Sequence, residues 1–410
     1  MRILVISCLY PPYYRGGYEI MCKLVNEKLI QRGHTIRVLT SDFKSNKKKI
    51  EGEVYRIFGY NFGGKTSFWK NLILEVRNNR ILKRQIRKFK PDIISIWHFV
   101  FLSRALLARL DSFEIPVVYN LEDHWLISWY YASKHEDWFS YFDFGNNRLK
   151  NILKFSIKNF LSFLVPTKWK SLNLTNIWFV SNSLKKQYLE AGLPVSSGEV
   201  IYNGLELEKF PLVPKERDKN ILRLLWVGRI AEYKGTHTAI EAMSILVNKL
   251  GIRNVRLSIV GEADNDKYLS FLKHLIKKNN LSDRITFESK LPRDKIVKKY
   301  LESDIFLFTS IYKEPFGLTW LEAFACGIPV VGTVTGASKE IFIDGENALV
   351  YKAGEDESLA LGVKRLIEDE HLYKKIQINA IEIVKQKFNI KDMVDKVEKL
   401  YQDALQKQSN

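Results

Sequence analysis

The chain has 410 residues, of which 46% are hydrophobic and 27% charged, so it is globular and too long for one hydrophobic core. Its three cysteines (Cys8, Cys22 and Cys326) are too few and too scattered for a disulfide framework or a metal site, and they favour a reduced, cytoplasmic setting. No apolar stretch approaches the roughly 20 residues that a membrane-spanning helix needs.

The net charge of +18 is concentrated in the first half of the chain. Residues 1–205 carry 31 Lys and Arg against 16 Asp and Glu, a net of +15, whereas the remainder carries 33 against 30, a net of +3. This asymmetry predicts an acidic partner for the first half, which could be membrane phospholipid, a phosphate-bearing acceptor or nucleic acid.

Strand and helix patterns alternate from the first residues onward. The opening apolar run ends at Pro11-Pro12 and is interpreted as a buried strand rather than a signal peptide. Runs such as Val255-Arg-Leu-Ser-Ile-Val-Gly261 are nearly continuous in apolar residues, as parallel strands covered on both faces require. Strands are predicted at residues 2–7, 35–40, 92–97, 116–120, 177–181, 222–228, 255–260, 285–288, 304–310, 329–333 and 348–351.

The polar, proline-bearing segment 206–220 predicts a linker between two domains. The sequence therefore predicts an α/β protein of two doubly wound, parallel-sheet domains, 1–205 and 206–389, that face each other across a crevice. A C-terminal helix at about 390–410 is expected to pack back on the first domain.

Two basic segments of the first half are predicted to form amphipathic helices. Residues 68–90 combine apolar side chains with eight Lys and Arg, and residues 149–170 have a similar composition. Such helices can lie on anionic membranes. An ordinary helix with a core face and a lysine-rich solvent face is the alternative, and the sequence leaves both open.

Residues with chemical potential follow two strands of the first half. After the first strand, Gly16-Gly17 leads into a helix, and adjacent glycines there let the backbone approach a phosphate or a sugar closely. The fourth strand is followed by Glu122-Asp123-His124, which combines two acids and an imidazole at a strand end. An ordinary turn and a structural histidine are the alternatives at these two places.

In the second half, the strand at 222–228 ends in Gly228-Arg229, and Lys234 opens the next helix. Cations at a strand end beside a helix N-terminus can bind a diphosphate, although two surface cations beside a turn would give the same pattern. Asp264-Asn265-Asp266 spells the Asp-x-Asp of metal-dependent transferases. Because a helix follows at once, these acids are interpreted as helix caps, and no metal requirement is predicted.

Glu314 and Glu322 are the most informative pair in the chain. Glu314 is predicted at the carboxyl end of the strand 304–310, and Glu322 inside the next helix. The backbone amides of Phe316, Gly317 and Leu318 lie between them. This arrangement suits a ligand with hydroxyls at both ends and phosphates in the middle, which describes a nucleotide sugar.

In this order and spacing, these features resemble glycosyltransferase family 4, the retaining nucleotide-sugar transferases of GT-B fold. The resemblance covers nearly the whole chain and is specific to the family but not to the substrate. It is strongest in Leu224-Leu-Trp-Val-Gly-Arg229, Val260-Gly261-Glu262, Glu314-Pro-Phe-Gly317, Leu321-Glu322-Ala-Phe-Ala-Cys-Gly327 and Asp344-Gly345.

The resemblance implies roles for individual residues. Arg229 and Lys234 would neutralise the diphosphate leaving group, Glu314 would hold sugar hydroxyls beside the reacting carbon, and Glu322 would bind the ribose. Family members of this type need no metal. The other implied donor-site residues are Gly16, Gly17, Gly228, Gly261, Phe316, Gly317 and Leu318.

One departure from the family concerns the cluster after the fourth strand. The family usually has His-Asp where this chain has Glu122-Asp123. The resemblance places both residues among the catalytic ones, but the usual histidine, which would hydrogen-bond the sugar, is replaced. His124 follows two positions after Glu122 and is a candidate to compensate for that loss.

The leading hypothesis is a retaining hexosyltransferase that uses a nucleoside-diphosphate sugar, with UDP-sugar favoured over GDP-sugar and with no cofactor or metal. The first domain would bind a glycan or lipid-linked acceptor of polysaccharide or glycoconjugate biosynthesis, and the second would bind the donor. A cytoplasmic protein, peripheral on the inner face of the plasma membrane, is expected.

Two classes of alternative are a nucleotide-sugar epimerase or phosphorylase of the same fold, and a basic membrane- or nucleic-acid-binding protein with a non-catalytic nucleotide site. The full set of Arg229, Lys234, Glu314 and Glu322 argues against a non-catalytic site. No aromatic residues are interleaved with the basic ones as in nucleic-acid modules, so no nucleic-acid partner is predicted.

Overall fold

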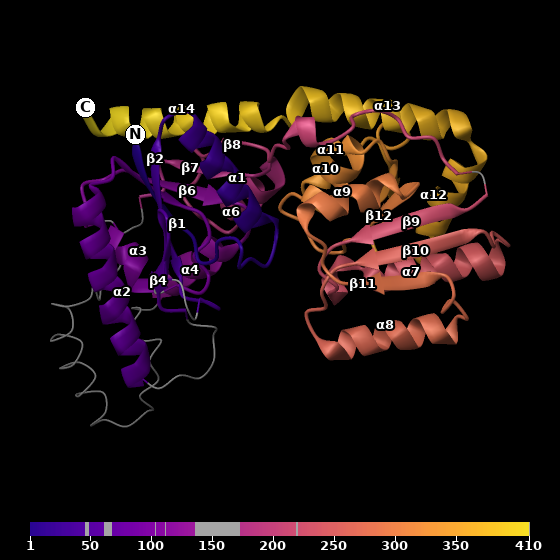
Figure 1. Ribbon diagram of the computed structural model, residues 1–410, viewed down its shortest axis with the longest axis horizontal. Helices are drawn as coiled ribbons and strands as arrows, with labels where there is room; N and C mark the ends of the chain where they lie inside the picture. Colours follow the sequence, from indigo (N-terminus) through magenta and orange to yellow (C-terminus); the bar gives the residue numbers. More distant parts are fainter. Residues whose placement is uncertain are drawn as a thin grey trace. The chain divides into compact units, whose positions relative to one another are not determined.

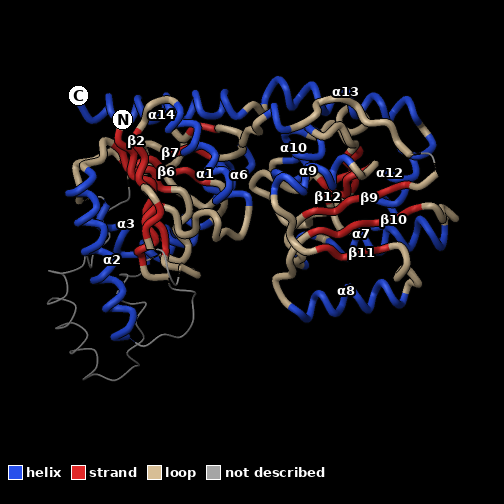
Figure 2. Tube along the Cα trace, viewed as in Figure 1, coloured by secondary structure: helices blue, strands red, loops and turns tan. Residues whose placement is uncertain are grey.

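The computed structural model describes residues 1–45, 49–60, 68–102, 104–110, 112–135, 173–218 and 220–409 (Figure 1). The chain divides into two compact units. Unit 1 comprises Met1–Val180, Leu184–Ile201 and Val394–Asn410, and unit 2 comprises Ser181–Ser183 and Tyr202–Met393. In each unit the strands form one layer with helices packed on it (Figure 2).

Unit 1 contains an eight-stranded sheet of order β3-β4-β2-β1-β5-β6-β7-β8, in which only the β3–β4 pair is antiparallel. Its strands are β1 (Arg2–Ile6), β2 (Thr35–Ser41), β3 (Ile50–Glu51), β4 (Val54–Phe58), β5 (Ile93–Ile96), β6 (Val117–Leu121), β7 (Ile177–Phe179) and β8 (Glu199–Val200). Its helices are α1 (Gly17–Gln31), α2 (Phe68–Phe89), α3 (Arg104–Leu110), α4 (Trp125–His135), α6 (Asn182–Glu190) and most of α14 (Ile390–Ser409).

The central strand β1 shows why the apolar runs form this sheet. It pairs in parallel with both β2 and β5, and Ile3, Leu4, Val5 and Ile6 are all fully buried. A strand covered on both faces has no solvent side, so it is apolar at consecutive positions. The predicted strands at 2–7, 35–40, 92–97, 116–120 and 177–181 are present with ends shifted by up to two residues.

Three strands, β3, β4 and β8, were not predicted. β3 and β8 are two residues long, too short to give a pattern. In β4 the apolar run is interrupted by Arg56, which is nonetheless only 2% exposed. Its guanidinium donates to the carbonyl oxygens of Tyr10 (2.9 Å) and Pro11 (2.6 Å). A charged side chain can be buried in a strand because these tertiary partners satisfy it.

The basic helix α2 is an amphipathic helix with a core face. Leu82 is fully buried, and Leu72 and Ile86 are each 7% exposed. The helix packs against α3, β4 and β1 of its own unit. Part of its apolar stripe therefore packs inside unit 1, while Ile73 of the same helix is 66% exposed, so both interpretations of this segment stay open. The second basic segment, 149–170, lies outside the described residues.

Unit 2 contains a six-stranded, entirely parallel sheet of order β11-β10-β9-β12-β13-β14. Its strands are β9 (Leu222–Val227), β10 (Val255–Val260), β11 (Ile285–Glu288), β12 (Ile305–Phe308), β13 (Val330–Thr333) and β14 (Leu349–Tyr351), all six of which were predicted. Its helices are α7 (Thr236–Ser244), α8 (Asp266–Lys278), α9 (Arg293–Leu301), α10 (Leu318–Ala325), α11 (Ser338–Ile341), α12 (Asp356–Glu368) and α13 (Glu370–Lys387), with a π-helical turn (Ile245–Lys249) after α7 and 3-10 turns at Leu207–Lys209 and Glu232–Lys234.

The order of this sheet reverses direction between β9 and β12. From β9 the chain moves outward to β10 and β11, then returns to β12 on the other side of β9 and continues to β13 and β14. Residues of α7, α8, α12 and α13 share one buried apolar cluster with the sheet. In such sheets the ligand site lies outside the carboxyl ends of the strands at the reversal point.

Segment 206–220, predicted to be a linker, belongs to unit 2 and contacts it through side chains. Lys215 donates to the carbonyl oxygen of Ser303 (2.6 Å) and to Asp304 (3.1 Å). Arg217 donates to the carbonyl oxygens of Leu366 and Ile367 near the end of α12. The polar, proline-bearing composition thus indicated a segment without a described strand or α-helix. Its side chains nonetheless contact unit 2.

No helix in the described ranges is both long enough and apolar enough to span a bilayer.

Candidate active site

The carboxyl ends of β9 and β10 are held together through two loop glycines. The amide of Gly228 donates to the carbonyl oxygen of Val260 (3.0 Å), and that of Ile230 to Glu262 (2.8 Å). A Cβ added at Gly261 would lie 1.8 Å from the carbonyl oxygen of Gly228. Gly261 is therefore required by close backbone approach, and it sets where the residues after β9 lie.

Arg229 follows directly and has a polar environment. Its Nη1 donates to the Tyr233 hydroxyl (3.1 Å), and its Nε lies 3.6 Å from Asp264. The Arg229 side chain is 38% exposed, so it remains accessible to an anion. Asp264 therefore contacts a cation rather than capping α8. The cap of that helix is Asn265, whose side chain accepts from the amide of Tyr268 (2.8 Å).

Lys234 and Glu314 form an ion pair at the reversal point of the sheet. Lys234 ends the turn after β9, and Glu314 lies in the loop after β12. The same Glu314 oxygen, Oε1, accepts a hydrogen bond from the Ser310 hydroxyl (2.8 Å). The Glu314 side chain is only 7% exposed and that of Lys234 24%. A carboxylate buried to this extent needs such partners.

The N-terminus of α10 lies just beyond Glu314. Gly317 occupies its cap position with φ of 102°, a conformation that favours glycine, and as a glycine it has no side chain with which to cap the helix. The preceding Phe316 is 3% exposed and packs against Trp320 and Phe388. The amides of the first turn, beginning at Leu318, are thus anchored in place at the positive end of the helix dipole.

Glu322 occupies the second turn of α10 and is 8% exposed. The Tyr300 hydroxyl lies 3.3 Å from Glu322 Oε2 and 3.0 Å from the carbonyl oxygen of Thr319, which ties the side chain to the body of the helix. Arg229, Lys234, Glu314, Glu322 and the amides at the start of α10 therefore all belong to unit 2, after β9 and β12. Together they offer two cations, two carboxylates and a helix N-terminus.

In unit 1, Gly16 and Gly17 stand at the start of α1, as predicted. The amide of Gly16 donates to the carboxylate of Glu19 (3.1 Å), which itself is 3% exposed. The loop between β1 and α1 is thus fixed by a buried acid from the first turn of the helix.

The three residues after β6 point to different places. Glu122 is buried beside α1, where it contributes, after burial, to raising the pKa of Cys22. The side chain of Asp123 is 33% exposed. His124 Nε2 lies 2.9 Å from Gln187 Oε1 on α6. The structure therefore separates the predicted acid–acid–imidazole cluster.

The imidazole that does meet Asp123 comes from another strand. His98 follows β5, and its Nε2 lies 3.3 Å from Asp123 Oδ2. Burial alone lowers the pKa of His98, but Asp123 and Glu19 outweigh burial, so the pKa lies above the ordinary 6.5. His98 was not predicted as a site residue from the sequence. The available signal was a histidine directly after a predicted buried strand whose carboxyl end neighbours that of β6.

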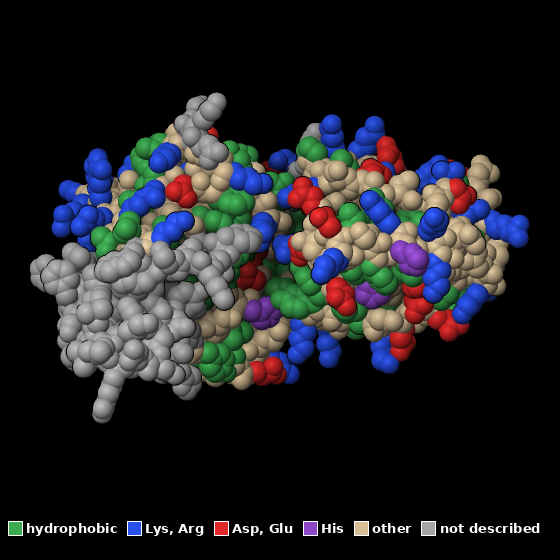
Figure 3. Space-filling model, turned by 90° about the horizontal axis from the view of Figure 1, so that it is seen from below, with side chains coloured by type: hydrophobic (Ala, Val, Ile, Leu, Met, Phe, Trp, Pro, Cys, Tyr) green, Lys and Arg blue, Asp and Glu red, His purple; other side chains and the backbone are tan. Residues whose placement is uncertain are grey.

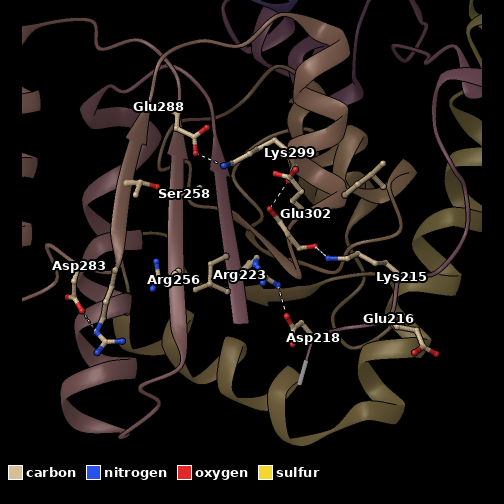
Figure 4. Close-up of a pocket in the computed structure, with 15 residues that line it drawn as sticks. Lys215, Glu216, Asp218, Arg223, Arg256, Ser258, Asp283, Glu288, Lys299 and Glu302 are labelled. Atoms are coloured by element: carbon tan, nitrogen blue, oxygen red, sulfur yellow. Dashed lines mark hydrogen bonds and ion pairs between the residues drawn. The ribbon is translucent and has the colours of Figure 1, made fainter. Parts of the chain in front are cut away.

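A cavity of about 680 Å³ elsewhere in unit 2 contains none of the predicted site residues (Figure 4). Arg223 and Arg256, the second residues of β9 and β10, lie on its floor, whereas the candidate site follows the ends of the strands. Much of its charge is neutralised internally, since Lys299 pairs with Glu288 and Arg223 with Asp218 (3.0 Å). Among the described residues, no group of three or more His, Cys, Asp or Glu side chains is arranged to hold a metal ion.

Two family models match the chain in succession. "Glycosyltransferase Family 4" matches residues 15–209, and "Glycosyl transferases group 1" matches residues 208–383. The chain belongs to the family 4, group 1 glycosyltransferases. It is therefore an enzyme of the glycosyltransferase class.

Two relatives are similar over about half of this chain. An uncharacterized glycosyltransferase of Methanocaldococcus jannaschii, MJ1069, is 30% identical over 54% of this chain and 57% of that protein. The capsular polysaccharide biosynthesis glycosyltransferase CapM of Staphylococcus aureus is 28% identical over 56% of this chain and 62% of that protein. The chain thus spans about three fifths of the length of these two relatives.

The fold is shared more widely than the sequence. The crystal structure of Anabaena HepE in complex with UDP and glucose matches with a TM-score of 0.69 at 20% identity, over 98% of this chain and all of that one. The two parallel-sheet α/β units therefore have the GT-B fold of group 1 glycosyltransferases, as the resemblance implied.

Proposed function

We propose that this glycosyltransferase moves a sugar from a nucleoside-diphosphate sugar, a UDP-sugar in preference to a GDP-sugar, to a hydroxyl of a glycan or lipid-linked acceptor, with retention of configuration. The observation that carries the proposal is the buried Lys234–Glu314 pair between the ends of β9 and β12, beside the N-terminus of α10. Donor binding is assigned to residues 206–389 and acceptor binding to residues 1–205.

The two cations account for departure of the nucleoside diphosphate. As the bond between the sugar and the phosphate oxygen breaks, negative charge grows on the diphosphate. Arg229, Lys234 and the amides of Gly317 and Leu318 are assigned to that charge, which makes their interactions strongest in the transition state. Gly228 and Gly261 set the backbone beneath it. No metal ion is required in this scheme.

The carboxylates account for recognition of the two ends of the donor. Glu322, held by Tyr300, is assigned to the ribose hydroxyls, and Glu314 to the hydroxyls of the transferred sugar. The acceptor hydroxyl attacks the anomeric carbon from the face that the diphosphate leaves, and the departing phosphate oxygen takes the hydroxyl proton. Asp123 and the Gly16-Gly17 loop of unit 1 are assigned to substrate hydroxyls, with Glu122 beside them.

A UDP-sugar is supported by the solved relative from Anabaena, which holds UDP and glucose. Polysaccharide or glycoconjugate biosynthesis is supported by the name of the S. aureus relative. A lipid-linked acceptor at an anionic membrane surface is supported by the net charge of +15 on residues 1–205. On the face in Figure 3, Lys and Arg side chains of unit 1 stand among few acidic ones, whereas on unit 2 the two signs are mixed.

The test is release of nucleoside diphosphate from UDP-, GDP-, ADP- and dTDP-sugars by the wild type and by Glu314→Gln and Lys234→Ala. We expect slow hydrolysis of a UDP-sugar by the wild type, unchanged by a chelator, and a loss of at least about 100-fold in each variant, because each removes a charge-assisted contact made in the transition state. Lys352→Ala is the matched control, because Lys352 pairs with Glu355 on the exposed surface of the same unit.

Release from no donor, even with anionic vesicles and a lipid-phosphate acceptor present, would contradict the proposal. Loss of turnover on addition of chelator would contradict its metal independence. Equal activity of Glu314→Gln and wild type would show that the site lies elsewhere.

A further inference from the structure

His98 brings together titratable side chains from three separate elements of unit 1. Its Nε2 lies 3.3 Å from Asp123 Oδ2, after β6, and its Nδ1 lies 3.9 Å from Glu19 Oε1, on α1. The backbone is fixed as well, because the carbonyl oxygen of His98 accepts from the amide of Cys8 at the end of β1 (2.5 Å). The imidazole thus bridges two carboxylates at the carboxyl edge of the sheet.

The burial of this histidine requires an explanation. His98 is 9% exposed, and its Nδ1 has no hydrogen-bond partner within the part of the chain that the structure describes. A neutral imidazole would place no positive charge between the carboxylates of Glu19 and Asp123, which lie 3.9 Å and 3.3 Å from its two nitrogens. A protonated imidazole balances both carboxylates and is the form that this geometry favours.

The bridge connects two predicted substrate-binding features. Glu19 also accepts from the amide of Gly16 (3.1 Å), so one end of the bridge holds the Gly16-Gly17 loop. At the other end, Asp123 Oδ1 accepts from the amide of Trp125 (2.9 Å). With both oxygens oriented and a side chain 33% exposed, Asp123 still has lone pairs available to a substrate hydroxyl.

We propose that protonated His98 is a positioning residue of the substrate site in unit 1: it orients the Asp123 carboxylate toward a substrate hydroxyl and, through Glu19, holds the Gly16-Gly17 loop. This proposal rests on the proposed glycosyl transfer. It assigns to His98 the imidazole function for which the sequence offered His124, whose ring instead contacts Gln187 on α6.

The proposal makes the site dependent on pH. The groups facing His98 are Glu19 and the ring of Tyr18 (5.2 Å) from α1, Asp123 after β6, and Arg15 and Cys8 from the segment after β1. Burial and Arg15 oppose the imidazolium, but the two acids outweigh them, and the pKa of His98 is raised. A raised pKa means that the bridge is present below pH 6.5 and is lost as the pH rises through the pKa of folded His98.

The first experiment follows the histidine side chains of the full-length protein by NMR, with selective labelling of the seven histidines. The resonance absent in His98→Gln identifies His98. We expect it to titrate above 6.5 in the wild type, to titrate at lower pH in Asp123→Asn and in Glu19→Gln, and to be unchanged in His124→Ala. Titration at or below 6.5, or no response to Asp123→Asn, would overturn the proposal. This readout does not depend on turnover.

The second experiment measures hydrolysis of the donor identified above as a function of pH. We expect kcat/KM of the wild type to fall as His98 deprotonates. His98→Gln should show about a tenfold or larger loss at low pH and no further fall at high pH, since one charge-assisted interaction is gone. His124→Ala should keep the wild-type profile.

A wild-type profile in His98→Gln, with its thermal midpoint unchanged, would overturn the positioning role. Inactivity of the wild type on every donor would instead refute the proposed function, and the NMR titration would still decide the bridge.

Discussion

Lys234 and Glu314 are assigned to different parts of the donor, yet in the described structure their side chains pair with each other. Both are mostly buried, and Ser310 donates to the same carboxylate oxygen. The pairing keeps two buried charges neutralised when no substrate is bound. A diphosphate that binds Lys234 would share this cation with the Glu314 carboxylate. Donor binding is therefore coupled to the position of Glu314.

We therefore predict strong coupling between these residues in the free energy of unfolding. Lys234→Met should destabilise the protein by about 2–4 kcal/mol, because it removes the cation and leaves the buried Glu314 carboxylate with the Ser310 hydroxyl as its remaining described partner. The double variant Lys234→Met/Glu314→Gln should be destabilised by less than the sum of its single variants. Urea unfolding measures each value. Additive effects would show that the pair is not formed in solution.

The exposed pair Lys352–Glu355 is the control for this cycle. Both side chains are in solvent, so Lys352→Met should leave unfolding unchanged within error.

At the scale of elements, the site depends on how closely two loops approach. The turn after β9 and the turn after β10 meet at Gly228 and Gly261, where main-chain atoms leave no space for a side chain. The position of Arg229 follows from that contact, since it is the next residue after Gly228. Gly261 thus affects the position of Arg229 through backbone geometry.

Gly261→Ala should accordingly reduce both stability and donor binding. The added methyl group would displace the backbone of Gly228, at a cost of about 2–4 kcal/mol. Urea unfolding, together with the thermal shift produced by UDP, measures the two effects. Gly251→Ala is the matched control, because nothing lies within 4 Å of a Cβ added there. It should cost about 1–2 kcal/mol for its positive φ and leave the UDP shift unchanged. Similar UDP shifts in wild type and Gly261→Ala would contradict the argument.

At the scale of the whole molecule, the chain returns to unit 1 at its end. The last part of α14, from Val394, belongs to unit 1, although the helices before it belong to unit 2. Polar contacts hold this part of the helix. Glu398 pairs with Arg32 and His34 (2.7 Å each), and the Tyr401 hydroxyl lies 2.7 Å from that of Ser95.

This docking should weaken in acid. Burial raises the pKa of Glu398, but Arg32 and His34 outweigh burial, and the pKa lies below its ordinary 4.5. A lowered pKa gives a stabilisation that is present above pH 4.5 and is lost as the pH falls through the folded value. Glu398→Gln should therefore lower the free energy of unfolding by about 1 kcal/mol at pH 7, and the difference from wild type should shrink as the pH falls below 4.5. A constant difference between pH 7 and pH 3 would contradict this assignment.

Most of the fold was predictable because buried parallel strands carry their own pattern. Every strand of unit 2 and five strands of unit 1 (β1, β2, β5, β6 and β7) could be located from continuous apolar runs. Strand β4 was missed since Arg56 breaks its run, and nothing local shows that the carbonyls of Tyr10 and Pro11 will satisfy the guanidinium.

The sequence alone determined the class of enzyme through its resemblance to a family, because the residues that carry it, such as Arg229, Lys234, Glu314 and Glu322, lie within strand–loop–helix segments. Within one strand–loop–helix segment, the carboxyl end of the strand and the N-terminus of the next helix are close because a short loop joins them. Contacts between different strand–loop–helix segments depend on the order of the strands in the sheet, and the local sequence pattern does not encode that order. Only the tertiary structure placed His98 beside Asp123, because β5 and β6 are neighbours in the sheet. It also placed the ring of His124 beside Gln187 on α6.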